Sequence, residues 1–147
     1  MNTPAEKAAR DKVWGYLADF AHVEAEVTEL CIAEIPLPNE GDQTHFRGRP
    51  ISEKLSWLRE VGFMTKPVIG EHELDDLIKR IEDLMPAQAL MGMSAIEPAP
   101  NGGIYLRNRD SGVVLIWSAE DFARSSRHLE VIEKVVKAIK LKLAAAR

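Results

Sequence analysis

Apolar residues recur every three or four positions along two long stretches, one near each end of the chain. In the first stretch these positions are Ala9, Val13, Tyr16, Phe20, Val23, Val27 and Leu30. In the second stretch Phe122, Leu129, Val136 and Leu143 lie seven apart, and Ile132 and Ile139 occupy intermediate positions. This spacing places each set on one face of a helix, which we call its apolar seam. We therefore predict helices over residues 4–34 and 119–146.

Residues at both helix starts support these boundaries. Thr3 can cap the first helix, with Pro4 at its first position and Glu6 at its third. Ser118 and Asp121 have the spacing of a capping box at the start of the second. An alternative interpretation ends the first helix near Ala21 and makes residues 26–35 a strand.

The middle of the chain carries shorter periodic segments. We predict helices over 52–61 and 71–85, because Gly62 and Pro86 are typical stop signals. Residues 36–50 read as an exposed loop without secondary structure of its own. Residues 87–96 fit either a last helical turn or a strand.

Two β-rich runs lie within residues 103–117. They are separated by Asp110, Ser111 and Gly112, which are typical turn residues, so we predict a β-hairpin here. Residues 98–103, rich in Pro and Gly, predict a hinge or tight turn before it.

These elements predict a single α+β domain over residues 1–147. Its long N-terminal and C-terminal helices would pack around two shorter helices and a small antiparallel β-hairpin or meander. Residues 4–34 hold seven acids and three bases, whereas residues 119–147 hold four acids and seven bases. Opposite charge beside matching apolar seams suggests that the two helices pack together, within one chain or between two copies. We expect a homodimer formed through these helices.

Composition narrows the class of protein. Apolar residues make up 46% and charged residues 29%, and the formal net charge is −4. These values fit a folded chain and argue against a surface devoted to nucleic acid. No signal-peptide pattern or apolar run of membrane-spanning length occurs in the sequence. We expect a cytoplasmic protein that does not contact membranes.

Few residues suggest catalysis or metal binding. His22 with Glu26, and His72 with Asp76, are four apart on predicted helices, but neither pair extends to a third ligand at a recognised spacing. Cys31, the single cysteine, lies among apolar neighbours and fits a packing role. We therefore expect no metal, no cofactor and no enzymatic activity.

Two segments are candidates for partner binding. Residues 44–49 place His45 and Phe46 beside Arg47 and Arg49, and arginine and aromatic residues are enriched at interface hot spots. The predicted hairpin tip carries Arg107 and Arg109. In the alternative interpretation Phe46 packs onto the core and the hairpin tip is an ordinary polar turn.

The favoured functional hypothesis is a non-enzymatic module that binds another protein, as an adaptor, an effector chaperone or a small inhibitor. The alternative is a winged-helix-like DNA-binding regulator, because the order of elements is similar and Arg107 and Arg109 would lie on the wing. Against it, the helix that would enter the major groove begins with four carboxylates, which repel phosphates; they are Glu71, Glu73, Asp75 and Asp76.

Overall fold

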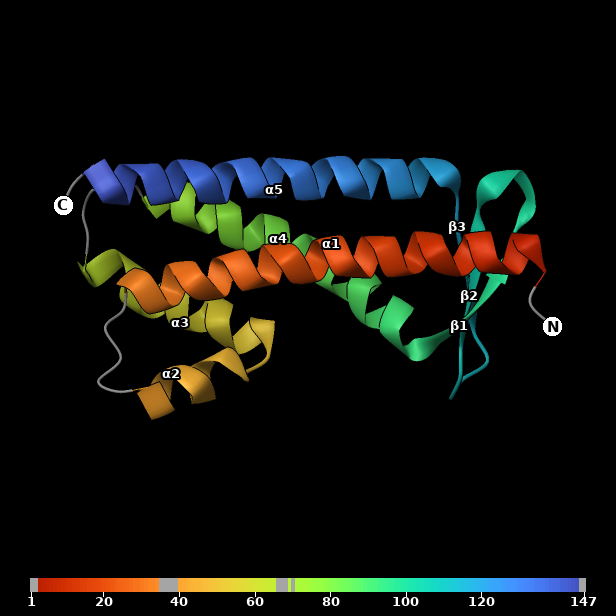
Figure 1. The fold of residues 1–147 in the computed structure, drawn as a ribbon, viewed down its shortest axis with the longest axis horizontal. Coiled ribbons are helices and arrows are strands. Elements are labelled where there is room, and N and C mark those ends of the chain that lie inside the picture. Colours follow the sequence, from red (N-terminus) through yellow and green to blue (C-terminus); the bar gives the residue numbers. More distant parts are fainter. Residues whose placement is uncertain (1–2, 35–39, 66–68, 70, 146–147) are drawn as a thin grey trace. The chain divides into compact units, whose positions relative to one another are not determined.

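The computed structural model describes residues 3–34, 40–65, 69 and 71–145, and its fold is α+β (Figure 1). In chain order the elements are α1 (Pro4–Glu34), α2 (Glu40–Arg47), α3 (Ile51–Thr65), α4 (Glu71–Met93), β1 (Ser94–Pro98), the 3₁₀ turn η1 (Pro100–Gly102), β2 (Ile104–Asn108), β3 (Val114–Trp117) and α5 (Ala119–Ala145). Contacts between Cα atoms divide the chain into two units. Unit 1 comprises Met1–Ala21 and Asp83–Glu130, and unit 2 comprises His22–Glu82 and Val131–Arg147.

Both predicted terminal helices are confirmed, together with their caps. The backbone N–H of Glu6 donates to the Thr3 hydroxyl at 3.1 Å. Since α1 continues to Glu34, the alternative strand over residues 26–35 is wrong as far as residue 34; residue 35 lies outside the described residues. At the start of α5, the Asp121 N–H donates to the Ser118 hydroxyl at 3.1 Å, and the Ser118 N–H donates to the Asp121 carboxylate at 2.9 Å. This is the reciprocal bonding of a capping box.

The predicted loop over residues 36–50 is wrong where α2 forms, and residues 36–39 lie outside the described residues. Two features stabilise this short helix. The Phe46 side chain is buried, and Arg47 lies in the last turn, where the helix dipole favours cations. One buried aromatic is too short an apolar pattern to reveal a helix by periodicity.

Two predicted stop signals were also wrong. Helix α3 continues past Gly62 to Thr65, and α4 continues through Pro86 to Met93. Glycine costs about 1 kcal/mol inside a helix, and proline about 3 kcal/mol, so packing can outweigh either. Beyond Pro86 that packing includes Met91, which is buried. The ambiguous residues 87–96 divide into the end of α4 and the start of β1.

Unit 1 contains the antiparallel sheet, which has the strand order β1-β2-β3. The predicted hairpin is confirmed as β2 and β3, and β1 extends it to a meander. The predicted tight turn before the hairpin is η1, where Asn101 has a φ of 59°. Three aromatic rings from α1, β3 and α5 pack edge to face beside the sheet. Ring centroids are 5.8 Å apart for Tyr16–Trp117 and 5.0 Å apart for Trp117–Phe122.

Gly103, directly before β2, allows a close approach that no other residue would. A Cβ atom at this position would lie 2.7 Å from the carbonyl oxygen of Trp117, at the end of β3. The two strands therefore meet at this end of the hairpin only because position 103 has no side chain.

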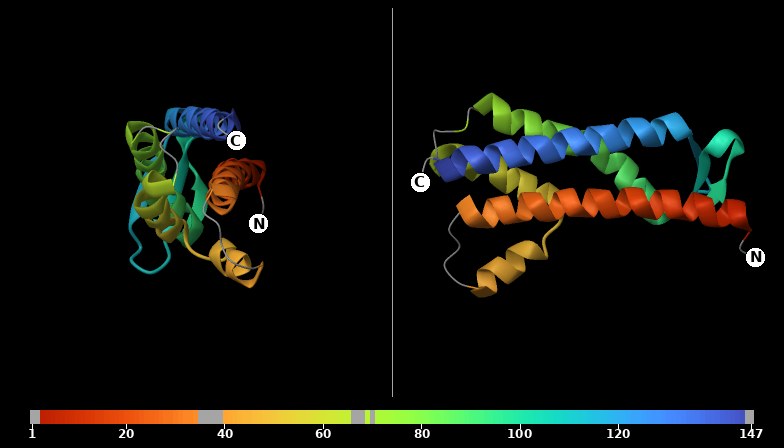
Figure 2. Two further views of the ribbon diagram at one scale, coloured as in Figure 1. Left: turned by 90° about the vertical axis from the view of Figure 1, so that its left-hand side faces the viewer. Right: turned by 45° about the horizontal axis from the view of Figure 1, so that its top comes forward.

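Unit 2 contains the C-terminal parts of α1 and α5, which run side by side in the same direction (Figure 2). The carboxylate of Glu26 accepts a hydrogen bond from Lys140, and the side chains of His22 and Glu133 approach within 3.8 Å. The hydrogen bond and charge of Lys140 hold the pKa of Glu26 below its usual value. The expected contact between the terminal helices therefore forms within one chain.

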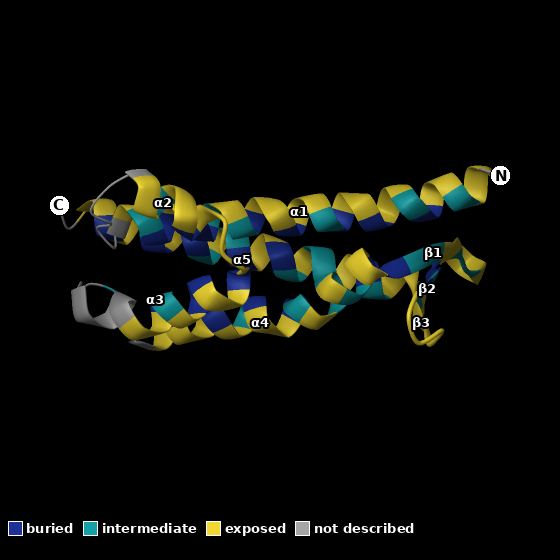
Figure 3. Cartoon of the chain, turned by 90° about the horizontal axis from the view of Figure 1, so that it is seen from below, coloured by how far each residue is buried: buried dark blue, intermediate teal, exposed yellow. Residues whose placement is uncertain are grey.

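The apolar seams of both helices are buried within the units, as the periodicity predicted, and α1 shows a row of buried positions in Figure 3. From α1 and α5 the buried hydrophobic residues are Ala9, Val13, Tyr16, Phe20, Val23, Val27, Leu30, Cys31, Phe122, Leu129, Ile132, Val136, Ile139 and Leu143.

Candidate functional site

The turn between α2 and α3, in unit 2, forms an open hollow of about 910 Å³. Two backbone hydrogen bonds lie at the C-terminal end of α2. The Gly48 N–H donates to the Thr44 carbonyl at 3.2 Å, and the Arg49 N–H donates to the Phe46 carbonyl at 3.1 Å. Helix α3 then starts at once, with the Glu53 N–H bonded to the Pro50 carbonyl. We call this hollow the corner surface. Its lining residues are Thr44, His45, Gly48, Arg49, Pro50, Glu53, Trp57 and Glu60.

Phe46, predicted as a partner-binding residue, faces the interior and not the corner surface. Only 5% of it is exposed, and its ring packs edge to face on Trp57 with centroids 6.1 Å apart. This is the alternative interpretation of Phe46 from the sequence. Phe46 therefore anchors α2 to α3 and supports the Trp57 wall of the corner surface from behind.

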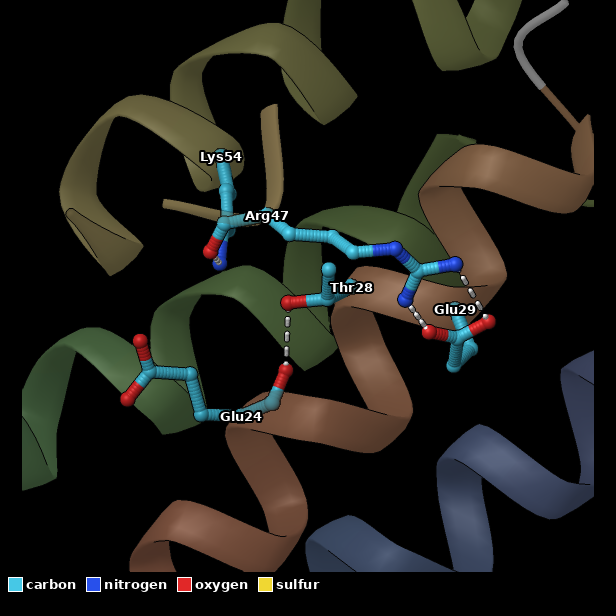
Figure 4. A network of polar contacts seen from close by, with 5 residues as sticks. All are labelled: Glu24, Thr28, Glu29, Arg47 and Lys54. Atoms are coloured by element: carbon cyan, nitrogen blue, oxygen red, sulfur yellow. Dashed lines mark hydrogen bonds and ion pairs between the residues drawn. The ribbon is translucent and has the colours of Figure 1, made fainter. Parts of the chain in front are cut away.

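Arg47 is engaged within the chain as well (Figure 4). Its guanidinium binds both carboxylate oxygens of Glu29 on α1, the second at 3.4 Å. Its carbonyl oxygen accepts a hydrogen bond of 2.9 Å from the ammonium group of Lys54, whose side chain is buried. Near Arg47, the Thr28 hydroxyl donates back to the Glu24 carbonyl within α1 at 2.8 Å. These bonds hold α2 against α1 and α3, so Arg47 acts as a positioning residue.

His45 and Arg49 remain at the corner surface with exposed polar groups. The Nη2 atom of Arg49 lies 3.3 Å from Nε2 of His45, and its Nε atom lies 3.8 Å from the Glu53 carboxylate. A guanidinium can only donate, so Nε2 of His45 is the acceptor in this contact. Both contacts are at the long end of their range and solvent-exposed, so a partner can replace them at little cost.

Arg107 and Arg109 belong to unit 1, so the candidate residues do not form one described site. The Nε atom of Arg107 lies 3.5 Å from the Glu97 carboxylate on the neighbouring strand. Arg109 lies in the turn of the hairpin, where the side-chain oxygen of Asn108 accepts bonds from the N–H groups of Asp110 and Ser111 at 2.9 and 3.0 Å. The Arg109 side chain is exposed.

The sequence did not reveal that β3 would be exposed. Its apolar residues predicted a strand, and such a run is typical of burial on both faces. Instead β3 is one of the two edge strands, and it appears as an exposed segment in Figure 3. Exposed fractions are 59% for Val113, 39% for Val114, 47% for Leu115 and 64% for Ile116. Edge position depends on the final strand order, for which the chain carries no local signal.

The histidine and cysteine candidates take structural positions. Asp76, the neighbour of His72, pairs with Arg80 at 2.8 Å, and Glu26, the neighbour of His22, pairs with Lys140. Within the described residues, no three His, Cys, Asp or Glu side chains form a cluster that could hold a metal ion. Burial raises the pKa of the Cys31 thiol to about 12, so this thiol is protonated at neutral pH and is a poor nucleophile.

None of the helices in the described part of the chain has an apolar stretch long enough to cross a bilayer. Comparison of the chain with protein-family models, curated proteins and solved structures found no match.

Proposed function

We propose that the chain is a non-enzymatic protein-binding module, serving as an adaptor, an effector chaperone or a small inhibitor of another protein. One observation carries this proposal: the corner surface is an open hollow in which exposed His45 and Arg49 lie beside the Trp57 ring. Arginine and tryptophan are the side chains most enriched where partner proteins bind strongly, because they combine large contact area with directional donors.

The shape of the corner surface favours a protein over a small molecule. Pockets for small ligands enclose 70–90% of the ligand surface, whereas this hollow is open to solvent. Its charges are mixed, with Arg49 beside Glu53 and Glu60. A projecting loop of a folded partner, with one acidic group for Arg49 and one basic group for Glu60, matches this pattern.

The terminal helices offer no comparable surface. The apolar seams that suggested a homodimer are used inside the units, so a partner could reach them only after unfolding. We therefore assign partner binding to the corner surface.

Arg49→Ala provides the test, and Arg59→Ala is its matched control. Both arginines are about equally exposed and each pairs with one carboxylate, but Arg59 pairs with Glu82 and does not line the corner surface. Proteins captured from a native lysate by the wild-type chain and by Arg59→Ala should be captured less by Arg49→Ala, and lost when His45→Ala is added to it. Equal capture by all variants, with unchanged circular dichroism, would refute the corner surface as the interface.

DNA binding has less support than protein binding. The acidic start of α4 would have to face phosphates, and two of its carboxylates already pair with cations, Glu73 with Lys142 at 2.5 Å and Asp76 with Arg80. Fluorescence anisotropy against random duplex DNA across a salt series decides the matter. We expect flat anisotropy at low salt, and binding that weakens steeply with added salt would replace our proposal with a DNA-binding function.

A further inference from the structure

The open edge of the sheet in unit 1 exposes a continuous run of apolar residues. In β2, Ile104 and Leu106 are completely buried, but their register partners in β3 are Trp117 and Leu115, and Leu115 is about half exposed. Residues 113–117 are all apolar, without a charged residue or proline. Edge strands normally carry such residues because they block pairing with other chains. β3 has none of these protections.

The backbone groups of β3 alternate between β2 and the open edge. The Asn108 N–H donates to the Val113 carbonyl at 2.8 Å, so residue 113 faces β2. Antiparallel pairing alternates along the strand, so Leu115 and Trp117 also face β2. The N–H and C=O groups of Val114 and Ile116 consequently point away from β2, in the plane of the sheet, where they can form hydrogen bonds with another strand.

We propose that a second copy of this chain occupies that edge, through antiparallel pairing of the two β3 strands about Leu115. In this register Val114 of each copy lies opposite Ile116 of the other, and the two pairs form four N–H···O=C bonds. Val113 lies opposite Trp117, and Leu115 lies opposite its own counterpart. Every pair is apolar on both sides, and the contact is closed by a twofold axis. The two meanders become one six-stranded sheet.

Charges flanking β3 are complementary at one position in this register, where Arg109 falls opposite Asp121, whereas Asp110 falls opposite Glu120. The turn of each hairpin, with Arg109, comes beside the first turn of the other copy's α5, where Glu120 and Asp121 lie. In the described part of the chain no ion pair engages Arg109. A second copy therefore brings Asp121, which also lies 3.6 Å from Arg124 of its own helix, opposite this exposed guanidinium, twice by symmetry.

The size of the contact sets its strength. Stable protein–protein complexes bury about 800 Å² on each partner, and a five-residue strand edge provides less. We therefore expect a reversible dimer with a Kd on the order of 10 μM. At this affinity the edge is open in dilute solution and paired in concentrated solution.

Disulfide trapping tests both the pairing and its register. Leu115 faces its counterpart as a non-hydrogen-bonded pair with Cα atoms about 4.5 Å apart, within the range for a disulfide. Leu115→Cys should therefore form covalent dimers rapidly on mild oxidation. Ile116→Cys is the matched control, because it faces residue 114 and its counterpart lies too far away to be bridged. The wild-type chain is the control for cross-linking through Cys31, which is buried. Equal trapping at positions 115 and 116 would disprove the register.

Sedimentation velocity between about 1 and 500 μM tests the dimer without cross-linking. Wild type should shift from monomer to dimer, and Val114→Pro should stay monomeric, because it removes an outward N–H and leaves the bonds to β2 intact. Ile116→Lys should also stay monomeric, because it places a charge in the apolar contact. A wild-type chain that remains monomeric throughout overturns the proposal. So does protection of the Val114 and Ile116 amides that arises only when a different protein is added.

Discussion

The corner surface and the β3 edge contrast in how residue type relates to exposure. At the corner, the residues that looked most suited to binding are partly used inside the chain: Phe46 is buried and Arg47 binds Glu29. At the edge, residues that looked suited to a core, Val114 and Ile116, face solvent. An aromatic or arginine side chain thus marks an interface only after its internal contacts are known, and an apolar strand marks a core only after its neighbours are known.

The largest effect should come from Phe46→Ala. Removing a buried phenylalanine leaves a cavity between α2 and α3, and such changes cost about 3–5 kcal/mol of unfolding free energy. Arg49→Ala, three residues away but solvent-exposed, should cost less than about 1 kcal/mol. Urea unfolding of the two variants measures the difference. A loss in Phe46→Ala as small as that expected for Arg49→Ala would mean that Phe46 has no anchoring role.

A second pair of variants compares two leucines that are register partners in the same hairpin. Leu106 is fully buried and Leu115 is 47% exposed. Leu106→Ala should lower the free energy of unfolding by about 2–5 kcal/mol. Leu115→Ala should lower it by less than half as much, because the part of its side chain that stays in water does not contribute to stability. Thermal unfolding at low micromolar protein concentration, where the edge is unpaired, makes this measurement. An equal cost for both would indicate that β3 is covered in solution.

A smaller effect than that of either core variant should come from Ser118→Ala, at the point where β3 passes into α5. Losing this cap should cost about 1 kcal/mol. The hydrogen bond from the Ser118 N–H lowers the pKa of Asp121, followed by the bond from its hydroxyl. A lowered pKa stabilises the fold above the unfolded pKa of about 3.9, and this stability disappears as the pH falls through the folded pKa.

The titration of Asp121 tests the capping box. Carboxylate chemical shifts followed by NMR should show the pKa of Asp121 rising only part of the way toward its usual value in Ser118→Ala, because the Ser118 N–H remains. An unchanged titration in this variant would show that the Ser118 hydroxyl does not lower the pKa of Asp121.

Much of the fold could be predicted from the sequence because it rests on repeating or local signals. The apolar seams of α1 and α5 repeat over many turns, and the caps at Thr3 and Ser118 depend only on residues within three positions. Periodicity averaged over a long segment is a strong signal, and caps involve few alternatives.

The predictions that were wrong share a physical cause, which is packing between residues far apart in the sequence. Pro86 and Gly62 are helix breakers locally, yet α4 and α3 continue past them. Phe46 stabilises α2 through Trp57, eleven positions on, as no window within α2 reveals. Of the candidate site, the sequence located the segment at residues 44–49 but could not separate His45 and Arg49, which stay exposed, from Phe46, which does not.

The contact between Glu26 and Lys140 spans 114 positions along the chain. On a ribosome, α1 leaves well before the part of α5 that belongs to unit 2. Until then Val23, Val27 and Leu30 have no partner from the C-terminal helix, and the nascent chain depends on chaperones or on transient collapse to protect them. Contacts between residues far apart in the sequence also slow folding. Premature termination before residue 131 would therefore produce a chain that cannot complete unit 2, whatever the stability of its individual helices.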